Sequence, residues 1–337
     1  MKVFMVGDFI NDDGPGVANK QLKIGLSDKD VIYCEASGKI ARVVELFKMI
    51  WKSDVVCFCS PSNINTIGLL IAKMMKKKSF YRAHGFLYIE SALSNNITEK
   101  IRGKILKKEK FWFKMAEKTY WVSKHAKNEV LKYLPEYEEK FDYVYNGIDF
   151  SNIENIINRS NCKRQNNYII SVGGGMKRKN NLMICRAINS LNQKGYNLRF
   201  IVIGKPYTEK DKICKYDFVE YYEKIPHDKV IEKMKSGYLY IQNSDFETFG
   251  MAVVEAIFSG CNILISDAVG AIDVLDTIED SDLIRNTQDL EEIEEKIKNI
   301  LSNPNNQRIK EGLNIEKIDN RNIGHMLYEK MLEEYRR

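Results

Sequence analysis

The sequence lacks a long apolar run. No stretch of the 337 residues reaches the roughly 18 to 20 consecutive apolar residues that a transmembrane helix needs. The opening MKVFMVGDFINDD turns acidic too soon for a secretory signal, so we expect it to form a first strand. Both features favour a protein that does not span a membrane.

Cysteine is scarce and is not arranged for metal binding. The seven cysteines are an odd number without metal-ligand clustering, which indicates reduced thiols. Cys57 and Cys59 share one side of a strand-like run, where we expect core thiols. A convincing D-x-D pair at a strand end is also missing, since Asp28-Lys29-Asp30 and Asp280-Ser281-Asp282 both resemble solvated turns.

Two common nucleotide-binding fingerprints are absent. Gly14 and Gly16 flank Pro15 in a loop that should lead into a helix starting near Val17. This G-P-G spacing is not G-x-G-x-x-G, which argues against a nicotinamide dehydrogenase. The G-x-x-x-x-G-K-[ST] spacing of a P-loop is missing as well.

Charge is unevenly distributed. Residues 1–150 carry 25 basic and 18 acidic side chains, whereas the remainder carries 27 and 28. The excess lies between Lys100 and Lys132, with 11 basic and three acidic side chains. The segment is either a solvated basic helix or a surface that docks on anionic lipid or an anionic acceptor. Nucleic acid is not an expected partner, because no basic-aromatic recognition motif accompanies the charges.

Strand-like and helix-like segments alternate along the whole chain. Five strand candidates in the first half are separated by amphipathic segments such as KIARVVELFKMIWK and INTIGLLIAKMMKKK, and the same order resumes after the polar segment 161–167. Such alternation predicts parallel sheets covered by helices on both faces. We therefore expect an α/β protein with two Rossmann-like doubly wound domains, 1–150 and 151–315. A C-terminal helix in 316–337 is expected to pack back on the first domain.

The most unusual stretch is SDFETFGMAVVEAIFSGCNILISDAVGAIDVL, from Ser244 to Leu275. Glu255 stands inside MAVVEAIF, where every neighbour is apolar, so we expect a mostly buried helix. A buried carboxylate needs hydrogen-bond donors from the protein or from a ligand. Gly250 and Gly260 stand where the chain should enter and leave this helix.

The helix N-terminus is a candidate anion site. N–H groups from Phe249, Gly250 and Met251 should point out of it and attract a phosphate. Glu247 stands just before the same turn. Two acids flanking such a helix end suit a ligand with hydroxyls at both ends and phosphate in the middle, which is the form of a nucleotide-sugar.

A second ligand-like segment is YIISVGGGMKRKN, where a strand runs into three glycines and then into Lys177-Arg178-Lys179. Small residues let the backbone approach a ligand closely, and the basic cluster can neutralise a diphosphate. His84-Gly85 falls where another strand should end, at the carboxyl edge where open α/β sheets bind ligands.

Together these landmarks resemble the GT-B glycosyltransferases, in particular glycosyltransferase family 4. E-TFGMAVV-E, followed by A-x-x-x-G and a strand, is similar to the family's E-x7-E signature. VYNGID (144–149) resembles its N-G-x-D hinge, SVGGGMKRKN its phosphate-lysine segment, and His84-Gly85 its acceptor-domain histidine. Departures include Gly174, which stands where an arginine is common, and Asp273, which approximates a usual glutamate.

The resemblance implies two domains that face each other across a cleft and close about a hinge at Asn146, Gly147 and Asp149. It implies that Glu255 binds the donor ribose and that Glu247 and His84 are the catalytic candidates, beside the transferred sugar. The remaining donor-binding candidates are Lys179, Arg178, Gly173, Gly174, Phe249, Gly250, Met251 and Gly16. Gly14 and Ser123 are expected in loops near the acceptor.

The implied reaction moves a sugar from a UDP- or GDP-sugar to an acceptor hydroxyl with retention of anomeric configuration, without a metal or other cofactor. We expect a glycan or lipid-linked acceptor in bacterial polysaccharide or glycolipid synthesis. The enzyme would be cytoplasmic and peripheral on the inner face of the membrane, through the 100–132 segment. A nucleotide-sugar epimerase of the same fold and a non-catalytic partner subunit remain open alternatives.

Overall fold

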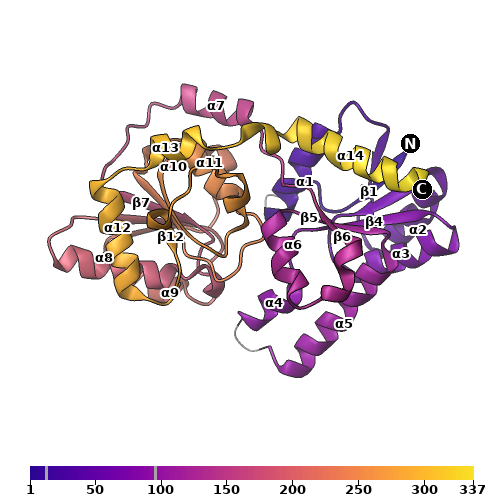
Figure 1. Cartoon of the computed structure of the whole chain (residues 1–337), viewed down its shortest axis with the longest axis horizontal. Coiled ribbons are helices and arrows are strands. Elements are labelled where there is room, and N and C mark those ends of the chain that lie inside the picture. The colour runs from indigo at the N-terminus through magenta and orange to yellow at the C-terminus, as the bar shows by residue number, and fades with distance from the viewer. Residues whose placement is uncertain (12–13, 95–96) are drawn as a thin grey trace. The chain divides into compact units, whose positions relative to one another are not determined.

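The computed structural model describes residues 1–11, 14–94 and 97–337. It divides into two compact units (Figure 1). The first comprises Met1–Ala92, Ile97–Ile148 and Glu316–Arg337, and the second is built from Asp149–Ile315. The chain therefore leaves the first unit after Ile148 and returns to it at Glu316.

The first unit contains a six-stranded parallel sheet in the order β2-β1-β3-β4-β5-β6. The five strands predicted for the first half are present as β1 Val3–Val6, β2 Val31–Tyr33, β3 Val55–Phe58, β4 Lys78–Ala83 and β5 Lys118–Trp121. A sixth, β6 Phe141–Tyr143, lies at the start of the segment that ends the first half. The strand order reverses at β1, which has β2 on one side and β3 on the other. This is a switch point, at whose carboxyl edge open α/β sheets bind ligands.

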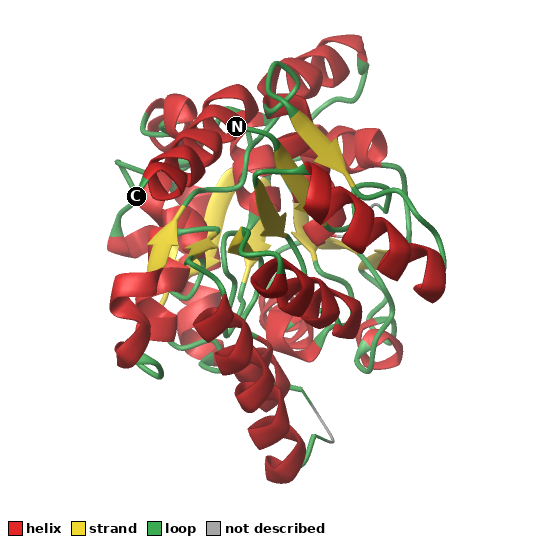
Figure 2. Ribbon diagram, turned by 90° about the vertical axis from the view of Figure 1, so that its right-hand side faces the viewer, coloured by secondary structure: helices red, strands yellow, loops and turns green. Residues whose placement is uncertain are grey.

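Helices cover the strands (Figure 2). In the first unit they are α1 Gly14–Gly25, α2 Lys39–Lys52, α3 Asn63–Met74, α4 Leu87–Ala92, α5 Glu99–Met115, α6 Lys124–Leu131 and α14 Asn320–Arg336. The prediction that a helix starts near Val17 was wrong, because α1 begins three residues earlier. Pro15 has a fixed φ suited to a first helical turn, so Gly14 and Gly16 lie within the helix and not in a loop.

The C-terminal helix α14 packs on α1 (Figure 1). Two glycines make the close approach: a Cβ added to Gly324 would lie 2.1 Å from the carbonyl oxygen of Gly25. Ile323, Leu327 and Met331 of α14 are fully buried. The end of the chain is therefore part of the first unit's core.

The second unit contains another six-stranded parallel sheet, in the order β12-β11-β10-β7-β8-β9. Its strands are β7 Tyr168–Val172, β8 Arg199–Ile203, β9 Val219–Tyr222, β10 Leu239–Gln242, β11 Asn262–Ser266 and β12 Leu283–Ile284. The sequence did not reveal β9, a half-buried edge strand of mixed polarity, or β12, which has two residues. The α/β class and the parallel sheets are confirmed.

The helices of the second unit are α7 Phe150–Arg159, α8 Asn181–Gln193, α9 Lys210–Ile213, α10 His227–Ser236, α11 Met251–Phe258, α12 Leu290–Ser302 and α13 Asn306–Glu311. The predicted buried helix is α11, with Gly250 at its N-cap and Gly260 just beyond its end. Both glycines have positive φ, 90° and 89°, a conformation that L side chains rarely adopt.

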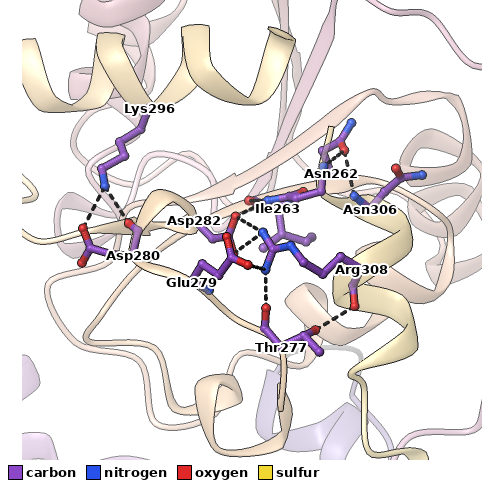
Figure 3. A network of polar contacts seen from close by, with 10 residues as sticks. Asn262, Ile263, Thr277, Glu279, Asp280, Asp282, Lys296, Asn306 and Arg308 are labelled. Atoms are coloured by element: carbon purple, nitrogen blue, oxygen red, sulfur yellow. Dashed lines mark hydrogen bonds and ion pairs between the residues drawn. The ribbon is translucent and has the colours of Figure 1, made fainter. Parts of the chain in front are cut away.

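One sequence prediction fails in the second unit. Asp282 was expected in a solvated turn but is 1% exposed. It accepts hydrogen bonds from Arg308 at 2.9 and 3.0 Å and from Asn305 at 2.7 Å, within the polar network of Figure 3. Arg308 also binds the carbonyl of Thr277. Asp282 therefore joins the segment before β12 to α13.

The cysteines are free thiols, and Cys57 and Cys59 are fully buried as predicted. Within residues 1–11, 14–94 and 97–337, no helix combines the length and apolar composition that crossing a bilayer requires.

Candidate active site

The candidate site of the second unit is centred on the ion pair between Lys179 and Glu247. Lys179 ends a short 3-10 helix after β7 (η2, Lys177–Lys179), and Glu247 lies in the loop after β10. The lysine ammonium donates to Glu247 Oε2, to which Gln242 Nε2 also donates at 3.2 Å. Arg178 lies 3.8 Å from the same oxygen. Two predicted donor-site cations therefore converge on one predicted catalytic carboxylate.

The Glu247 carboxylate is held in its charged form. Burial alone would raise its pKa, but Lys179 and Arg178 outweigh burial and leave the pKa lowered. The backbone N–H of Phe249 also donates to this carboxylate and lowers the pKa further. The Phe249 amide, predicted to attract phosphate, is thus directed at Glu247.

Asn180, Asp245 and Thr287, which the sequence analysis did not single out, hold the residues after β7 against the loop after β10. The Asn180 amide donates to the Asn243 carbonyl at 3.0 Å and to Asp245 at 2.7 Å. The Thr287 hydroxyl donates to the same Asp245 oxygen at 2.5 Å, and the Asp245 N–H donates to the Arg178 carbonyl at 2.9 Å. Asn180 itself has a φ of 50°, in the left-handed region that asparagine tolerates. These hydrogen bonds fix the position of Lys179 relative to Glu247.

Two of the glycines after β7 pack closely against other parts of the second unit. A Cβ on Gly173 would lie 2.7 Å from the Lys179 side chain, and one on Gly174 would lie 2.1 Å from the Lys205 carbonyl oxygen. Both residues have positive φ. Packing within the protein therefore already requires glycine at both positions, and their approach to a ligand stays a prediction.

Glu255 is buried on α11, with a side chain 8% exposed. Its Oε1 lies 2.9 Å from Nε2 of His227, at the start of α10. The predicted need for a donor is therefore met by a protein side chain that the sequence reasoning did not identify. The only signal was the position of His227 at the start of α10, shortly after β9.

The buried Tyr240 is connected to Glu247 through Gln242. Its hydroxyl donates to Gln242 Oε1 at 2.9 Å, and Gln242 in turn donates to Glu247. Burial raises the pKa of Tyr240, and the nearby charges of Glu247 and Glu255 raise it further. The hydroxyl therefore stays protonated and orients Gln242.

In the first unit, His84 follows β4 at the carboxyl edge of the sheet. Its Nε2 lies 2.9 Å from Asn19 Oδ1 on α1, and Asn19 donates to the Asp8 carbonyl at 3.0 Å. Burial, together with the positive charge of Arg82, lowers the pKa of His84 to about 3. The imidazole is therefore neutral at physiological pH and can act as a hydrogen-bonding group there.

The segment after His84 is fixed by Glu109 of α5, which is 2% exposed. Its carboxyl accepts the N–H groups of Leu87 and Tyr88 at 2.8 and 3.0 Å. Burial raises the pKa of Glu109 to about 8, despite these two hydrogen bonds. Glu109, although it belongs to the basic segment 100–132, is therefore buried and holds the backbone that follows His84.

The predicted hinge residues lie at the exit of the first unit. Arg82, fully buried, donates to the carbonyls of Val144 and Tyr145 and to Asn146 Oδ1, at 2.9 to 3.2 Å. A Cβ on Gly147 would lie 2.8 Å from the Asn320 Cα. Asp149 caps α7 by accepting the N–H of Asn152 at 3.0 Å. Hinge motion itself stays a prediction.

The remaining candidates are dispersed. Ser123 is fully buried and caps α6 by accepting the Ala126 N–H at 2.8 Å. Gly16 is buried and Gly14 exposed, both in the first turn of α1. The basic segment 100–132 is not a single helix, because the buried strand β5 separates α5 from α6.

The two sheets, each with its reversed strand order, define a GT-B fold. The family model described as glycosyl transferases group 1 matches residues 152–313, which lie within the second unit. The resemblance to GT-B glycosyltransferases is therefore confirmed, while membership of family 4 stays a prediction. No curated protein matches this sequence.

Solved structures share the fold at low identity. HepE from Anabaena, in complex with UDP-glucose, aligns with a TM-score of 0.69 and 14% identity over 99% of this chain and 100% of its own. Sucrose-phosphate synthase from Thermosynechococcus elongatus gives 0.72 and 14%, over 99% and 100%. The catalytic domain of starch synthase IV from Arabidopsis thaliana, bound to ADP and acarbose, gives 0.69 and 11%, over 99% of each chain.

Proposed function

We propose that this protein is a retaining glycosyltransferase that moves a sugar from a UDP- or GDP-sugar to an acceptor hydroxyl. The observation that carries the proposal is the cluster of Lys179, Arg178 and Glu247 beside the N-terminus of α11, within the region that matches the glycosyltransferase model. The UDP-glucose and ADP complexes of proteins with the same fold support a nucleotide-sugar donor.

The donor would engage the two halves of this cluster. Glu255, oriented by His227, would accept the ribose hydroxyls. Lys179 and Arg178 would stabilise the charge that develops on the leaving diphosphate by electrostatic preorganisation. A diphosphate at Lys179 would compete with Glu247, which would then be available to contact the donor sugar. The amides of Gly250 and Met251 would add the positive end of α11.

The acceptor hydroxyl would attack the sugar from the same face that the diphosphate leaves. The bond from the sugar carbon to the diphosphate oxygen breaks, the acceptor oxygen forms the new bond, and a donor phosphate oxygen takes the acceptor proton. Neutral His84 would hydrogen-bond the transferred sugar, and closure about Asn146 to Asp149 would exclude water. We propose that this proceeds without a metal, in the cytoplasm, on a glycan or lipid-linked acceptor in bacterial polysaccharide or glycolipid synthesis.

A thermal-shift screen with UDP, GDP, ADP and their sugars tests the donor site. A cognate nucleotide at 100 times its dissociation constant should add about 2.7 kcal/mol of stability. Glu255→Ala should abolish most of this stabilisation, whereas Glu295→Ala, an exposed glutamate on α12, should leave it unchanged. Absence of a response to every nucleotide would refute the proposal.

Product analysis tests the reaction. Incubation with the cognate donor and acceptor should give a glycoside with the anomeric configuration of the donor, read by NMR. An epimerised sugar formed without acceptor would identify an epimerase instead. Unchanged cellular glycan in a Glu255→Ala strain would favour a non-catalytic partner subunit.

A further inference from the structure

Helix α2 exposes a continuous apolar stripe. Ile40, Val44, Phe47 and Trp51 recur every three or four residues, so they share one helix face. Their exposed fractions are 84, 61, 58 and 70%. Another face of the helix carries the fully buried Leu46 and Ile50, which already anchor α2 to the first unit. Large apolar side chains that cluster in this way mark an interaction surface.

Helix α3 continues the surface. Ile67, Leu70 and Met74 form a second stripe, 42, 45 and 83% exposed. The two helices pack side by side (Figure 1), and a Cβ on Gly68 of α3 would lie 3.3 Å from the Leu46 side chain of α2. We call the seven exposed residues of the two stripes the α2–α3 face.

Basic side chains surround this face. Five exposed lysines lie on or next to the two helices: Lys39, Lys48, Lys52, Lys73 and Lys76. Within α2 and α3, both wholly described, the single carboxylate is Glu45. It is turned inward, where it accepts the N–H of Glu35 at 2.7 Å and lies 3.6 Å from Arg42. The occupant must therefore be apolar and anionic.

Helix α5 extends the positive charge. It packs beside α3, and Lys108 donates to Asn63 at the start of α3 at 2.7 Å. Its exposed Lys100, Lys104 and Lys107 share a helix face. An anionic bilayer offers both a charged surface for these lysines and an apolar boundary for the α2–α3 face. A second copy would set the same lysines against each other, which like-charge repulsion disfavours.

We propose that the α2–α3 face docks the first unit on an anionic lipid bilayer, with Phe47 and Trp51 entering the headgroup boundary. This inference deepens the proposed function and rests on it, because the face would carry the enzyme to a lipid-linked acceptor. It also relocates the expected membrane contact, since the 100–132 segment supplies charge through α5 while the apolar contact comes from α2 and α3.

Trp51 gives a direct test with the full chain. Of the three tryptophans, Trp112 and Trp121 are buried, so the exposed Trp51 will report on its surroundings. Vesicles of phosphatidylcholine with phosphatidylglycerol should shift its emission to the blue, and brominated acyl chains should quench it. Pure phosphatidylcholine should bind roughly fivefold more weakly for each lysine that meets the surface. Trp51→Phe should remove the spectral change but keep vesicle binding in a flotation assay.

Matched variants separate the apolar and charged contributions. Phe47→Ser with Trp51→Ser should weaken flotation at least about tenfold. Met326→Ser with Tyr335→Ser, exposed apolar positions on α14, should leave it unchanged. An unshifted Trp51 with anionic vesicles, or unweakened flotation of the double variant, overturns the proposal. A dimer that the same substitutions dissolve overturns it in favour of a second copy. Nucleotide-induced thermal shifts of these variants should equal the wild type, so a failed docking test is distinguishable from a failed donor site.

Discussion

Lys179 and Glu247 are both mostly buried, with side chains 10 and 16% exposed. Each therefore depends on the other, because an unpaired charge at this depth loses its hydration without compensation. The pair also decides what the site offers to a ligand, since an incoming diphosphate must take Lys179 from the carboxylate.

Lys179→Met should destabilise the protein by about 3 kcal/mol at pH 7, because it leaves Glu247 buried without its closest cation. Urea unfolding measures this loss. Lys179→Met with Glu247→Gln should recover most of it. In the wild type the folded pKa of Glu247 is lowered, so the stabilisation is present above the unfolded value of about 4.5 and is lost as pH falls through the folded value. An equal loss in the single and double variants would contradict this account.

His84 should stay neutral between pH 5 and 8, because burial and Arg82 lower its pKa to about 3. NMR titration of the four histidines, with His84→Asn for assignment, measures this. The unfolded chain takes up this proton near pH 6.5 and the folded chain does not, so stability falls as pH drops from 6.5 towards 3. A midpoint for His84 above pH 5 would exclude the predicted environment.

At the scale of elements, glycines decide which helices can touch. Gly324 lies in the interior of α14 against Gly25 of α1, whereas Gly103 lies in the interior of α5 with nothing within 4 Å of an added Cβ. Both positions are helical, so intrinsic propensity favours alanine at each by a similar amount. The two glycines therefore differ only in how closely neighbouring atoms pack against them.

Gly324→Ala should destabilise the protein by about 1 to 3 kcal/mol, because the new Cβ would meet the Gly25 backbone and force α14 away from α1. Gly103→Ala should stabilise it by about 1 kcal/mol. Chemical denaturation of both variants measures the difference. Changes of the same sign would show that α14 does not approach α1 as closely as the structure has it.

At the scale of the whole molecule, the chain completes its first unit only with its last residues. Helix α14 supplies three fully buried side chains to that unit, although residues 149–315 of the second unit lie between it and α1 in the sequence. The donor-site candidates of the second unit lie within 149–315. The stability of the first unit and nucleotide binding by the second unit should therefore respond separately to truncation.

Deleting residues 316–337 should lower the melting temperature of the first unit by more than about 10 °C, because each lost buried side chain removes about 1.5 to 3 kcal/mol. Circular dichroism follows this transition. The nucleotide-induced stabilisation of the second unit should persist. Its loss in the truncated protein would show that the donor site needs the first unit.

The amino-acid sequence by itself determined the features that depend on neighbours along the chain. Alternating apolar patterns predicted both parallel sheets, because strand and helix periods differ, and Gly250 and Gly260 marked the ends of α11 because each needs a positive φ. The resemblance of the sequence motifs to those of the GT-B glycosyltransferases also predicted the GT-B fold. Even so, the start of α1 and the strands β9 and β12 escaped local reasoning.

Only the tertiary structure decided which side chains meet. Lys179 and Glu247 are 68 residues apart, and His227 and Glu255 are 28 apart, so no spacing rule pairs them. Asp282 looked solvated until Arg308 and Asn305 enclosed it. The apolar residues of α2 occupy both of its faces, and helical periodicity cannot tell which face packs on the sheet. Packing buried Leu46 and Ile50 and left Phe47 and Trp51 exposed, because a helix on one side of a sheet can bury only one stripe.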